Sequence, residues 1–218
     1  MELLVATRSA GKMREIRRVL ADVPGLVIRD LDDVGIRFDP AEGRLEPYDT
    51  FEENARSKAD YFFEKSGIPT VADDSGIEVD ALDGAPGVRS KRFAPDARVD
   101  AKGLSGPSLD DANNRHLVAR LANIAAEDRT ARYVCVAVLV RGDSAPLVIR
   151  GEAPGLIVDK PSGSGGFGYD PFVFDQEVGK TFAEMSGEEK DGRSHRGSAF
   201  RGLAAELRTG LGLPPQSS

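Results

Sequence analysis

The sequence is poor in the residues that bind zinc or form disulfide bonds. Its 218 residues include a single cysteine, Cys135, and two histidines, His116 and His195. One cysteine cannot form an internal disulfide, which suits a reducing compartment such as the cytoplasm. The same scarcity disfavours a structural zinc site, which takes four cysteine or histidine ligands. Oxygen ligands remain, and these favour Mg²⁺ or Mn²⁺ if a metal is bound.

The sequence also lacks long apolar runs and an excess of positive charge. No apolar run has the length that spans a bilayer, and the N-terminal stretch 1–6 lacks the basic start of a signal peptide. We therefore expect no membrane association. The net charge of −7 argues against a protein that binds nucleic acid. It is compatible with a small phosphorylated ligand in a local basic pocket.

Hydrophobic spacing predicts one compact α/β unit over residues 1–211, followed by a flexible tail at 212–218, and the length fits one large domain or two closely joined lobes. The runs 132–140 and 147–151 resemble a hairpin around Gly142-Asp143, so a mixed sheet fits better than a parallel one. The predicted strands are 3–6, 69–72, 76–79, 132–140, 147–151 and 171–174. Helices are predicted after Gly11 and at 50–65, 108–126 and 196–207. Loops are predicted at 96–107 and 162–168.

The best-defined helix start is at Thr50. Thr50 and Glu53 have the spacing of a capping box, in which each side chain binds the backbone N–H of the other residue. Apolar residues then recur at helical intervals, and Gly67 and Pro69 end the pattern. We therefore predict a helix over 50–65 with one buried face.

The segment 7–12, Thr-Arg-Ser-Ala-Gly-Lys, lies between the first predicted strand and the first helix. Backbone N–H groups at a helix N-terminus carry partial positive charge and can hold a phosphate group, and Lys12 adds a full charge. The segment lacks the longer Gly-rich loop of the Walker pattern. Taken alone, it is better explained as a surface turn with a solvated lysine.

Two adjacent carboxylates occur at 72–76, Ala-Asp-Asp-Ser-Gly, where a predicted strand ends. Adjacent carboxylates repel unless cations neutralise them. Since side chains alternate along a strand, one aspartate can bind Mg²⁺ while the other orients or deprotonates a water molecule. The competing interpretation, which the segment alone favours, is a turn in which the aspartates cap backbone N–H groups.

Two further segments carry candidate binding residues. In the stretch 165–171, Gly-Gly-Phe-Gly-Tyr-Asp-Pro, glycines flank an aromatic residue, so Phe167 or Tyr169 can stack on a nucleobase while Asp170 accepts its N–H groups. A buried aromatic anchor explains this stretch equally well. Lys190 and the Ser-His-Arg start of a helix at 194–196 place donors where a base carbonyl or phosphate can bind. A solvated loop is the alternative for the polar stretch around Lys190.

Together these segments closely resemble the noncanonical purine NTP pyrophosphatases, the family of inosine/xanthosine triphosphate pyrophosphatases. The matching segments occur in the family's order and cover nearly the whole chain: 6–12, 50–55, 72–76, 84–88, 165–171, and Lys190 with 194–197. The resemblance implies an elongated, two-lobed α/β fold with a long mixed sheet flanked by helices and a cleft between the lobes. It also implies a homodimer and Mg²⁺-dependent hydrolysis of ITP, dITP and XTP to the monophosphate and pyrophosphate.

The resemblance assigns roles residue by residue. Asp74 matches the catalytic base and a metal-linked carboxylate, Glu46 matches a second acidic residue of the metal site, and Asp73 is left as a supporting residue. The substrate contacts match Ser75, the triphosphate-binding turn Thr7, Arg8, Ser9, Ala10, Gly11 and Lys12, the base-binding loop Phe167, Gly168, Tyr169 and Asp170, and the remaining positions Lys190, His195 and Arg196.

One position departs from the family pattern, because Ser9 stands where asparagine is usual. A serine keeps a hydroxyl but has a shorter reach, so we expect a shorter or water-mediated phosphate contact and no loss of activity. For selectivity, a donor such as Arg196 or a backbone N–H facing the 6-position would favour an oxo group over an amino group.

Two other functions are compatible with the sequence. One is a pyrophosphatase for pyrimidine or modified nucleotides on a related fold, and Ser-His-Arg at 194–196 favours the purine enzyme over it. The other is a nucleotide sensor without catalytic activity. The carboxylates of Asp73, Asp74 and Glu46 argue against a sensor, since a protein that only binds phosphates has little use for them.

Overall fold

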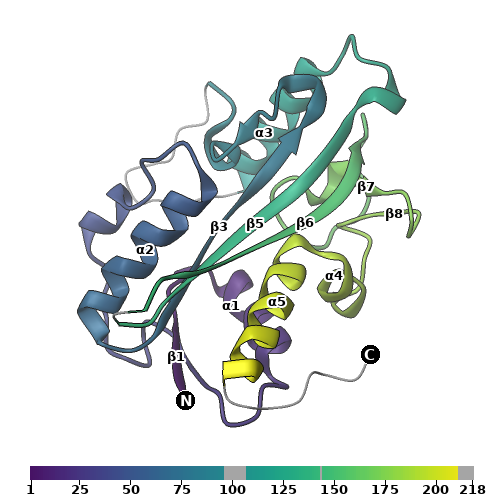
Figure 1. Cartoon of the computed structure of the whole chain (residues 1–218). Helices are drawn as coiled ribbons and strands as arrows, with labels where there is room; N and C mark the ends of the chain where they lie inside the picture. Colours follow the sequence, from purple (N-terminus) through teal and green to yellow (C-terminus); the bar gives the residue numbers. More distant parts are fainter. Residues whose placement is uncertain (96–106, 143, 211–218) are drawn as a thin grey trace. The chain divides into compact units, whose positions relative to one another are not determined.

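The computed structural model describes residues 1–95, 107–142 and 144–210 and has a mixed α/β fold (Figure 1). One eight-stranded sheet has the order β2-β1-β3-β5-β6-β7-β8, with β4 paired to β3. The strands are β1 Glu2–Val5, β2 Val27–Arg29, β3 Thr70–Val79, β4 Pro86–Gly87, β5 Thr130–Val140, β6 Leu147–Ile157, β7 Val173–Asp175 and β8 Lys180–Thr181. The α-helices are α1 Ala10–Leu20, α2 Phe51–Ser66, α3 Pro107–Arg120, α4 Gly187–Arg193 and α5 His195–Gly210.

The strand directions confirm the predicted mixed sheet. β1 pairs in parallel with β2 and β3, with Leu3 opposite Ile28 and Leu4 opposite Thr70. β7 pairs antiparallel with both β6 and β8. The sheet is open and flanked by helices, as the sequence predicts.

Contacts divide the chain into two compact units. The first unit comprises Met1–Ser75, Cys135–Glu152 and Ser194–Ser218, and the second comprises Gly76–Val134 and Ala153–Arg193. The divisions fall inside β3, β5 and β6, so each of these strands contributes residues to both units.

The first unit is built around strands covered on both faces. Figure 1 shows α1 and α5 side by side on one face and α2 on the other. Ile16 and Leu20 of α1 and Phe200 of α5 are fully or almost fully buried in one apolar cluster with the strands. Gly151 of β6 allows α5 to pack this closely, because a Cβ there would lie 2.3 Å from the carbonyl oxygen of His195.

Helix α2 follows the sequence prediction closely. The hydroxyl of Thr50 caps its N-terminus by accepting the backbone N–H of Glu53, and Gly67 ends it in a left-handed conformation. Its buried residues include the predicted apolar stripe Phe51, Ala55, Ala59 and Phe62.

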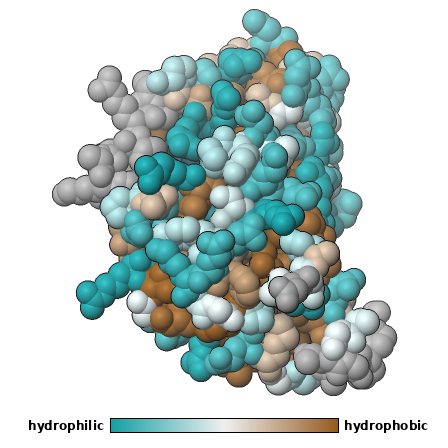
Figure 2. All heavy atoms as spheres, turned by 60° about the vertical axis from the view of Figure 1, so that its left-hand side comes forward, coloured by the Kyte–Doolittle hydropathy of each residue, from teal (hydrophilic) through white to brown (hydrophobic). Residues whose placement is uncertain are grey.

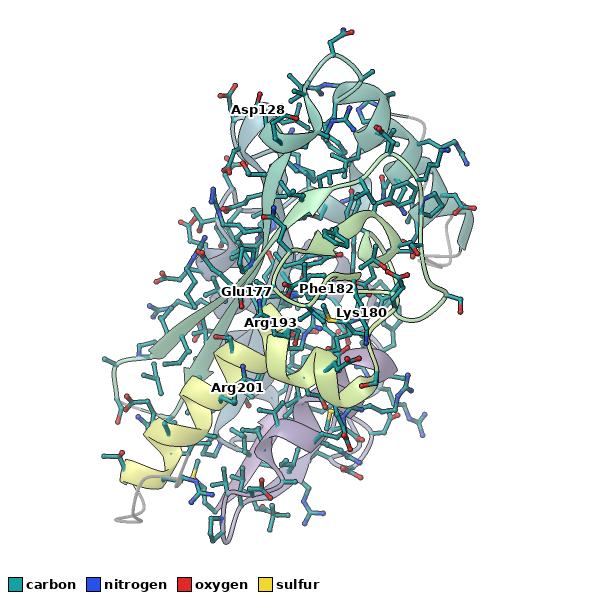
Figure 3. The ribbon with its side chains drawn as sticks, turned by 90° about the vertical axis from the view of Figure 1, so that its right-hand side faces the viewer. Asp128, Glu177, Lys180, Phe182, Arg193 and Arg201 are labelled. Carbon is teal, nitrogen blue, oxygen red and sulfur yellow. The ribbon has the colours of Figure 1, made fainter. Side chains whose placement is uncertain are left out.

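The second unit has its own apolar core and a short helix, α4, that is held by ion pairs. The rings of Tyr133 and Phe182 meet edge to face, with their centroids 5.2 Å apart. Helix α4 is held by ion pairs from Lys180 to Glu189 at 2.6 Å and from Arg193 to Glu177 at 2.7 Å, whose region is shown in Figure 3. These ion pairs fix the helix that carries Lys190.

Several element boundaries differ from the sequence predictions. The predicted strands 69–72 and 76–79 form the single strand β3, so Asp73 and Asp74 lie inside a strand and not in a turn. β6 continues beyond Gly151, because Ala153 and Ile157 extend its buried alternation. The helix predicted over 108–126 ends already at Arg120, and mostly turns and a bend follow it. The strand predicted over 171–174 begins only at Val173. The predicted tail and most of the loop 96–107 lie outside the described residues.

The surface is mainly polar. On the face shown in Figure 2, hydrophilic residues predominate and apolar residues emerge between them. Among the described residues, the large hydrophobic side chains that are exposed are Met1, Val27, Phe38, Tyr48, Val148 and Phe167. In the part of the chain that the structure describes, no helix combines the length and apolar character that crossing a bilayer requires.

Burial in the core of the first unit predicts that two phenylalanine substitutions lower the free energy of unfolding by very different amounts. Phe200 is 0% exposed and Phe38 is 70% exposed. We expect Phe200→Ala to lower the free energy of unfolding by about 3–5 kcal/mol, because it leaves a cavity. Phe38→Ala should stay within about 0.5 kcal/mol of the parent protein. Urea denaturation followed by circular dichroism measures both, and equal losses would contradict this account of the core.

Candidate active site

Asp73 is the most deeply buried carboxylate of the candidate site. It lies on β3, and its Oδ2 accepts hydrogen bonds from Lys12 Nζ and from the Ser75 hydroxyl, both at 2.8 Å. Burial acts to raise the pKa of Asp73, but the charges of Lys12, Arg196 and Lys58 hold that pKa well below its usual value. Asp73 is therefore ionised at neutral pH and is committed to neighbouring side chains.

Arg196 is the second counter-ion of Asp73. It lies in the first turn of α5, with Nε 3.5 Å from Asp73 Oδ2 and Nη1 2.5 Å from Glu15 Oε2. Burial opposes its charge, but Asp73 and Glu15 raise the pKa of the guanidinium. Its third nitrogen, Nη2, is 3.5 Å from the Ser75 hydroxyl. This arrangement favours a role in fixing Asp73 over the expected role of donor to the base.

The segment 7–12 forms the start of α1. The Ser9 hydroxyl caps the helix by accepting the backbone N–H of Lys12 at 3.3 Å, and the Thr7 hydroxyl accepts the N–H of Ser9 at 3.1 Å. Ala10 and Gly11 are the first helical residues. Ser9 therefore has a structural role that a short hydroxyl side chain fulfils well.

Arg8 points to a different partner from Lys12. Its Nη2 and Nε bind the carboxylate of Glu42 at 2.8 and 3.0 Å, and its Nη1 donates to the carbonyl oxygen of Ile36. The Glu42 hydrogen bond raises the pKa of Arg8 above its ordinary value, although partial burial opposes this shift. The side chain of Arg8 is therefore bound to Glu42 of the 3₁₀ helix Pro40–Arg44, whereas that of Lys12 is bound to Asp73.

Asp74 has a different environment from its neighbour. Its Oδ2 accepts the side-chain amide of Asn54 at 3.1 Å, and its Oδ1 accepts the backbone N–H of Ser75 at 3.0 Å. Burial raises the pKa of Asp74, and the negative charge of Glu46 raises it further, against the opposing effect of Lys58. A carboxylate that is oriented by two donors and has a raised pKa is suited to accept a proton.

Lys58 is a site residue that the sequence predictions missed. Its Nζ donates to Glu46 Oε1 and to the carbonyl oxygen of Asp73, each at 2.5 Å, and lies 4.0 Å from Asp74 Oδ1. Burial acts to lower the pKa of Lys58, but the surrounding carboxylates outweigh this effect and raise the pKa above its ordinary value. Lys58 is therefore a cation held between the three acidic residues.

Asn54 was missed together with Lys58, although the sequence contains a signal for both. They are four residues apart on α2, and each precedes a buried alanine, Ala55 or Ala59. Residues four apart share one side of a helix, so these polar residues border the apolar stripe that enters the core. A buried amide and a lysine at this spacing indicate a polar site under the helix.

Glu46 and Asp74 fit a magnesium ion by their chemistry. Both carboxylates surround the ammonium group of Lys58, and the charge of Glu46 acts on the pKa of Asp74. Mg²⁺ is commonly bound by one or two carboxylates, several waters and the phosphates of a substrate. Among the residues that the structure describes, no group of three acidic, histidine or cysteine side chains forms a closed metal cage. The donor set is compatible with Mg²⁺ shared with a phosphorylated ligand.

The base-binding candidates lie in the second unit. Phe167 is half exposed, and the Lys190 ammonium lies 5.3 Å from its ring centroid. Asp170 is buried and binds three donors: Lys190 Nζ at 2.6 Å, the Phe167 backbone N–H at 2.9 Å and the Tyr133 hydroxyl at 3.0 Å. Phe167 is thus the aromatic residue available for stacking, while Asp170 organises the loop.

Tyr169 does not fit the stacking role. Its side chain is buried, and its hydroxyl donates to the carbonyl oxygen of Ser90 at 2.7 Å. The residue before Phe167 has to be a glycine, because a Cβ at Gly166 would lie 2.0 Å from Asp170 Oδ2. The glycine-rich loop therefore combines an exposed ring, Phe167, with a buried anchor, Tyr169.

His195 belongs to the first unit, whereas the loop 165–171 belongs to the second. It is the first residue of α5 and is 8% exposed. The preceding hydroxyl of Ser194 accepts the backbone N–H of Gly197 at 3.0 Å. The structure thus groups Lys12, Asp73, Asp74, Ser75 and Arg196 in one hydrogen-bonded network of the first unit, and Phe167, Asp170 and Lys190 in another network of the second.

Comparison with known proteins gives full-length matches. Residues 3–206 match the model of the Ham1 family. The chain is 46% identical to a dITP/XTP pyrophosphatase of Mycolicibacterium paratuberculosis over 95% of this chain and 96% of that protein. It is 40% identical to a dITP/XTP pyrophosphatase of Thermus thermophilus over 96% of this chain and 93% of that protein.

Solved structures agree with these matches. A Ham1 protein of Staphylococcus aureus superposes with a TM-score of 0.79 at 33% identity, covering 96% of this chain and all of that one. A HAM1 protein of Coxiella burnetii superposes with a TM-score of 0.80 at 31% identity, covering 96% of this chain and 99% of that one.

Replacing each of the two aspartates by asparagine should change the stability of the protein very differently. Replacing Asp73 by Asn leaves Lys12 without its carboxylate and Arg196 with Glu15 alone, so we expect a loss of about 3–5 kcal/mol at pH 7. Asp74→Asn should cost little or stabilise the protein slightly, because folding raises the pKa of Asp74 and so disfavours its charge. Urea denaturation of both variants measures these differences, and a costlier Asp74→Asn would contradict them.

The pH dependence of the Asp73→Asn effect follows from the same shift. Folding lowers the pKa of Asp73, so its contribution is complete above the unfolded pKa of about 4 and is lost as the pH falls through the folded pKa. The stability difference between the parent protein and Asp73→Asn should therefore be constant between about pH 5 and pH 8. A difference that shrinks within this range would show that another group dominates.

Cys135 provides a chemical test of the buried network. Burial, together with the charge of Asp73, raises the pKa of its thiol to about 12. Since the thiolate is the nucleophile, we expect iodoacetamide at about pH 8 to leave native Cys135 unmodified and to alkylate it after urea denaturation. Mass spectrometry of the intact chain counts the added groups, and rapid alkylation of the native protein would contradict this burial.

Proposed function

Because this chain belongs to the Ham1 family, we propose that it is a nucleoside triphosphate pyrophosphatase that acts on noncanonical purine nucleotides. It hydrolyses dITP, ITP and XTP between the α- and β-phosphates and yields the nucleoside monophosphate and pyrophosphate. This reaction removes deaminated purines from the nucleotide pool. The observation that carries the proposal is the oriented carboxylate of Asp74 among fixed cations, in a chain that matches dITP/XTP pyrophosphatases over almost its full length.

Asp74 is proposed as the general base. It accepts a proton from water while the water oxygen attacks the α-phosphorus, the bond to the bridging oxygen breaks, and pyrophosphate leaves. Asn54 and the Ser75 N–H fix the two oxygens of Asp74, so its orientation does not have to be established during the reaction. Its raised pKa makes it a better proton acceptor than an ordinary exposed aspartate.

Lys12 and Lys58 are proposed to attract and orient the triphosphate. Each is already held in place by a carboxylate, Lys12 by Asp73 and Lys58 by Glu46. Such preorganised charges stabilise a negatively charged transition state without being rearranged. Glu46 and Asp74 would hold Mg²⁺, which would supply further charge neutralisation and make water more acidic.

Phe167 and Lys190 are proposed to bind the base. The exposed ring of Phe167 offers a stacking surface, and the ammonium group beside it is a donor that cannot accept. A 6-oxo group accepts such a hydrogen bond, whereas the 6-amino group of adenine competes as a donor. This assignment replaces Arg196, whose nitrogens face Glu15, Asp73 and Ser75.

Two further properties are predictions. The resemblance implies the first, assembly as a homodimer, and the single buried cysteine supports the second, location in the cytoplasm. Size-exclusion chromatography with light scattering tests the first, and fractionation of cells tests the second.

Asp74→Asn tests the chemistry. We expect pyrophosphate release from dITP with Mg²⁺ to fall by a factor of about 10²–10⁴, because the base is removed while the fold is retained. Asp128→Asn, at the exposed 3₁₀ helix labelled in Figure 3, is the matched control and should retain parent activity. Near-parent turnover by Asp74→Asn would refute its role as base.

A nucleotide panel tests the substrate class. We expect dITP, ITP and XTP to be hydrolysed at least about tenfold more efficiently than ATP, GTP, dTTP and UTP, because they present the 6-oxo group to a donor and lack a 2-amino group. Preference for dTTP or UTP would favour a pyrimidine enzyme. Tight binding of ITP without pyrophosphate release in the presence of Mg²⁺ would favour a sensor.

A further inference from the structure

Helix α3 holds the peptide groups of Gly168, directly after the proposed stacking residue. The Gly168 backbone N–H donates to Asp110 Oδ2 at 2.9 Å, and the Gly168 carbonyl oxygen accepts Asn114 Nδ2 at 2.9 Å. Asp110 and Asn114 are four residues apart on α3, so both face the same side of the helix. One side of α3 therefore binds both polar backbone groups of a single residue.

The peptide on the other side of the ring is also held by a side chain. Asp170 accepts the backbone N–H of Phe167 at 2.9 Å. Gly166 and Gly168, which flank the ring, have φ angles of +75° and +63°. Glycine loses more conformational freedom on ordering than any other residue, so this segment would be mobile without such bonds. Asp110, Asn114 and Asp170 thus fix the backbone that presents Phe167.

Helix α3 is itself attached to the surroundings of the loop. Asn113 accepts the backbone N–H groups of Phe93 and Ala94 at 3.0 and 2.9 Å and donates to the carbonyl oxygen of Lys91 at 3.1 Å. Tyr169, next to Gly168, donates to the neighbouring Ser90 carbonyl at 2.7 Å. The two adjacent asparagines therefore anchor different segments, and only Asn114 reaches the loop.

We propose that Asp110 and Asn114 are positioning residues that set the affinity of this enzyme for the purine base. They act through Gly168 by holding the Phe167 ring in its stacking position before the nucleotide arrives. A preformed platform spares the ordering of the loop that binding would otherwise require. The inference rests on the proposed function and adds two residues of the second unit, both on α3, to the proposed base-binding groups.

Asn114→Ala is the first test, and Asn113→Ala is its matched control. The two residues are adjacent and similarly buried, at 5% and 3% exposure. Replacement removes the one hydrogen bond from Asn114 to Gly168 and the three that Asn113 makes with residues 91, 93 and 94, so the control loses more bonds than the test variant. We expect Asn114→Ala to raise the KM for dITP about five- to tenfold, the effect of one hydrogen bond that fixes the platform, with kcat changed less than about twofold. Asn113→Ala should keep the parent KM even if it lowers thermal stability as much.

Inhibition by tripolyphosphate separates the base from the phosphates. This inhibitor has no base to stack, so its inhibition constant should be the same in the parent protein and in Asn114→Ala. Weaker tripolyphosphate inhibition in Asn114→Ala would show general damage to the site and would overturn the proposal.

Conservative exchange at Asp110 provides a rescue. Asp110→Asn keeps an oxygen that can accept the Gly168 N–H, so it should retain a KM near that of the parent. Asp110→Ala removes the acceptor and should raise KM as Asn114→Ala does. A parent-like KM for Asp110→Ala would overturn the role of Asp110.

Tryptophan fluorescence gives a direct readout of stacking. The 218-residue chain contains no tryptophan, so Phe167→Trp introduces a single reporter at the platform. With inosine monophosphate as the probe, we expect quenching whose midpoint rises about five- to tenfold when Asn114→Ala is added and stays unchanged when Asn113→Ala is added. Equal shifts with both variants would overturn the inference.

The proposed function and this inference fail in different ways. If the parent protein releases no pyrophosphate from dITP or XTP, the proposed function is wrong, whatever the fluorescence shows. If it releases pyrophosphate normally while Asn114→Ala matches Asn113→Ala in KM and in quenching, the function stands and the positioning role of α3 is wrong.

Discussion

The ionised Asp73 at the centre of the first unit is the interaction on which the site depends. Its carboxylate joins a strand to two helices, because Lys12 comes from α1 and Arg196 from α5. A buried charge without partners would be costly, so these elements can pack closely only when their charges meet. The same contacts fix Lys12 and the start of α1, the segment that we propose binds the triphosphate.

Neighbouring aspartates acquire opposite properties because alternate strand residues face different surroundings. Asp73 meets two cations, which keep its pKa low, whereas Asp74 meets an amide, a backbone N–H and the charge of Glu46. The sequence predicts that the two side chains face different sides of a strand, but it does not show which charged groups each of them meets. Position on β3 thus separates a structural anion, Asp73, from the proposed proton acceptor, Asp74.

The sequence predicts local features of this protein well and long-range partnerships poorly. The α2 cap at Thr50 and the buried stripe of α2 follow from spacing alone, and the mixed sheet follows from one hairpin. The continuity of β3 through two aspartates is not predictable, because it depends on Lys12, 61 residues away in the chain. The pairing of Lys58 with Glu46 and the burial of Tyr169 likewise depend on contacts that only the folded chain creates.

The division of the chain into two units has a consequence for how such an enzyme can diversify. The proposed hydrolytic groups all belong to the first unit, and the proposed base-contacting groups and their supports in α3 all belong to the second. Mutations that retune the preferred base can therefore accumulate without disturbing the carboxylates and lysines that break the phosphoanhydride. A lineage can acquire a new nucleotide preference in small steps, while its hydrolytic machinery is inherited unchanged.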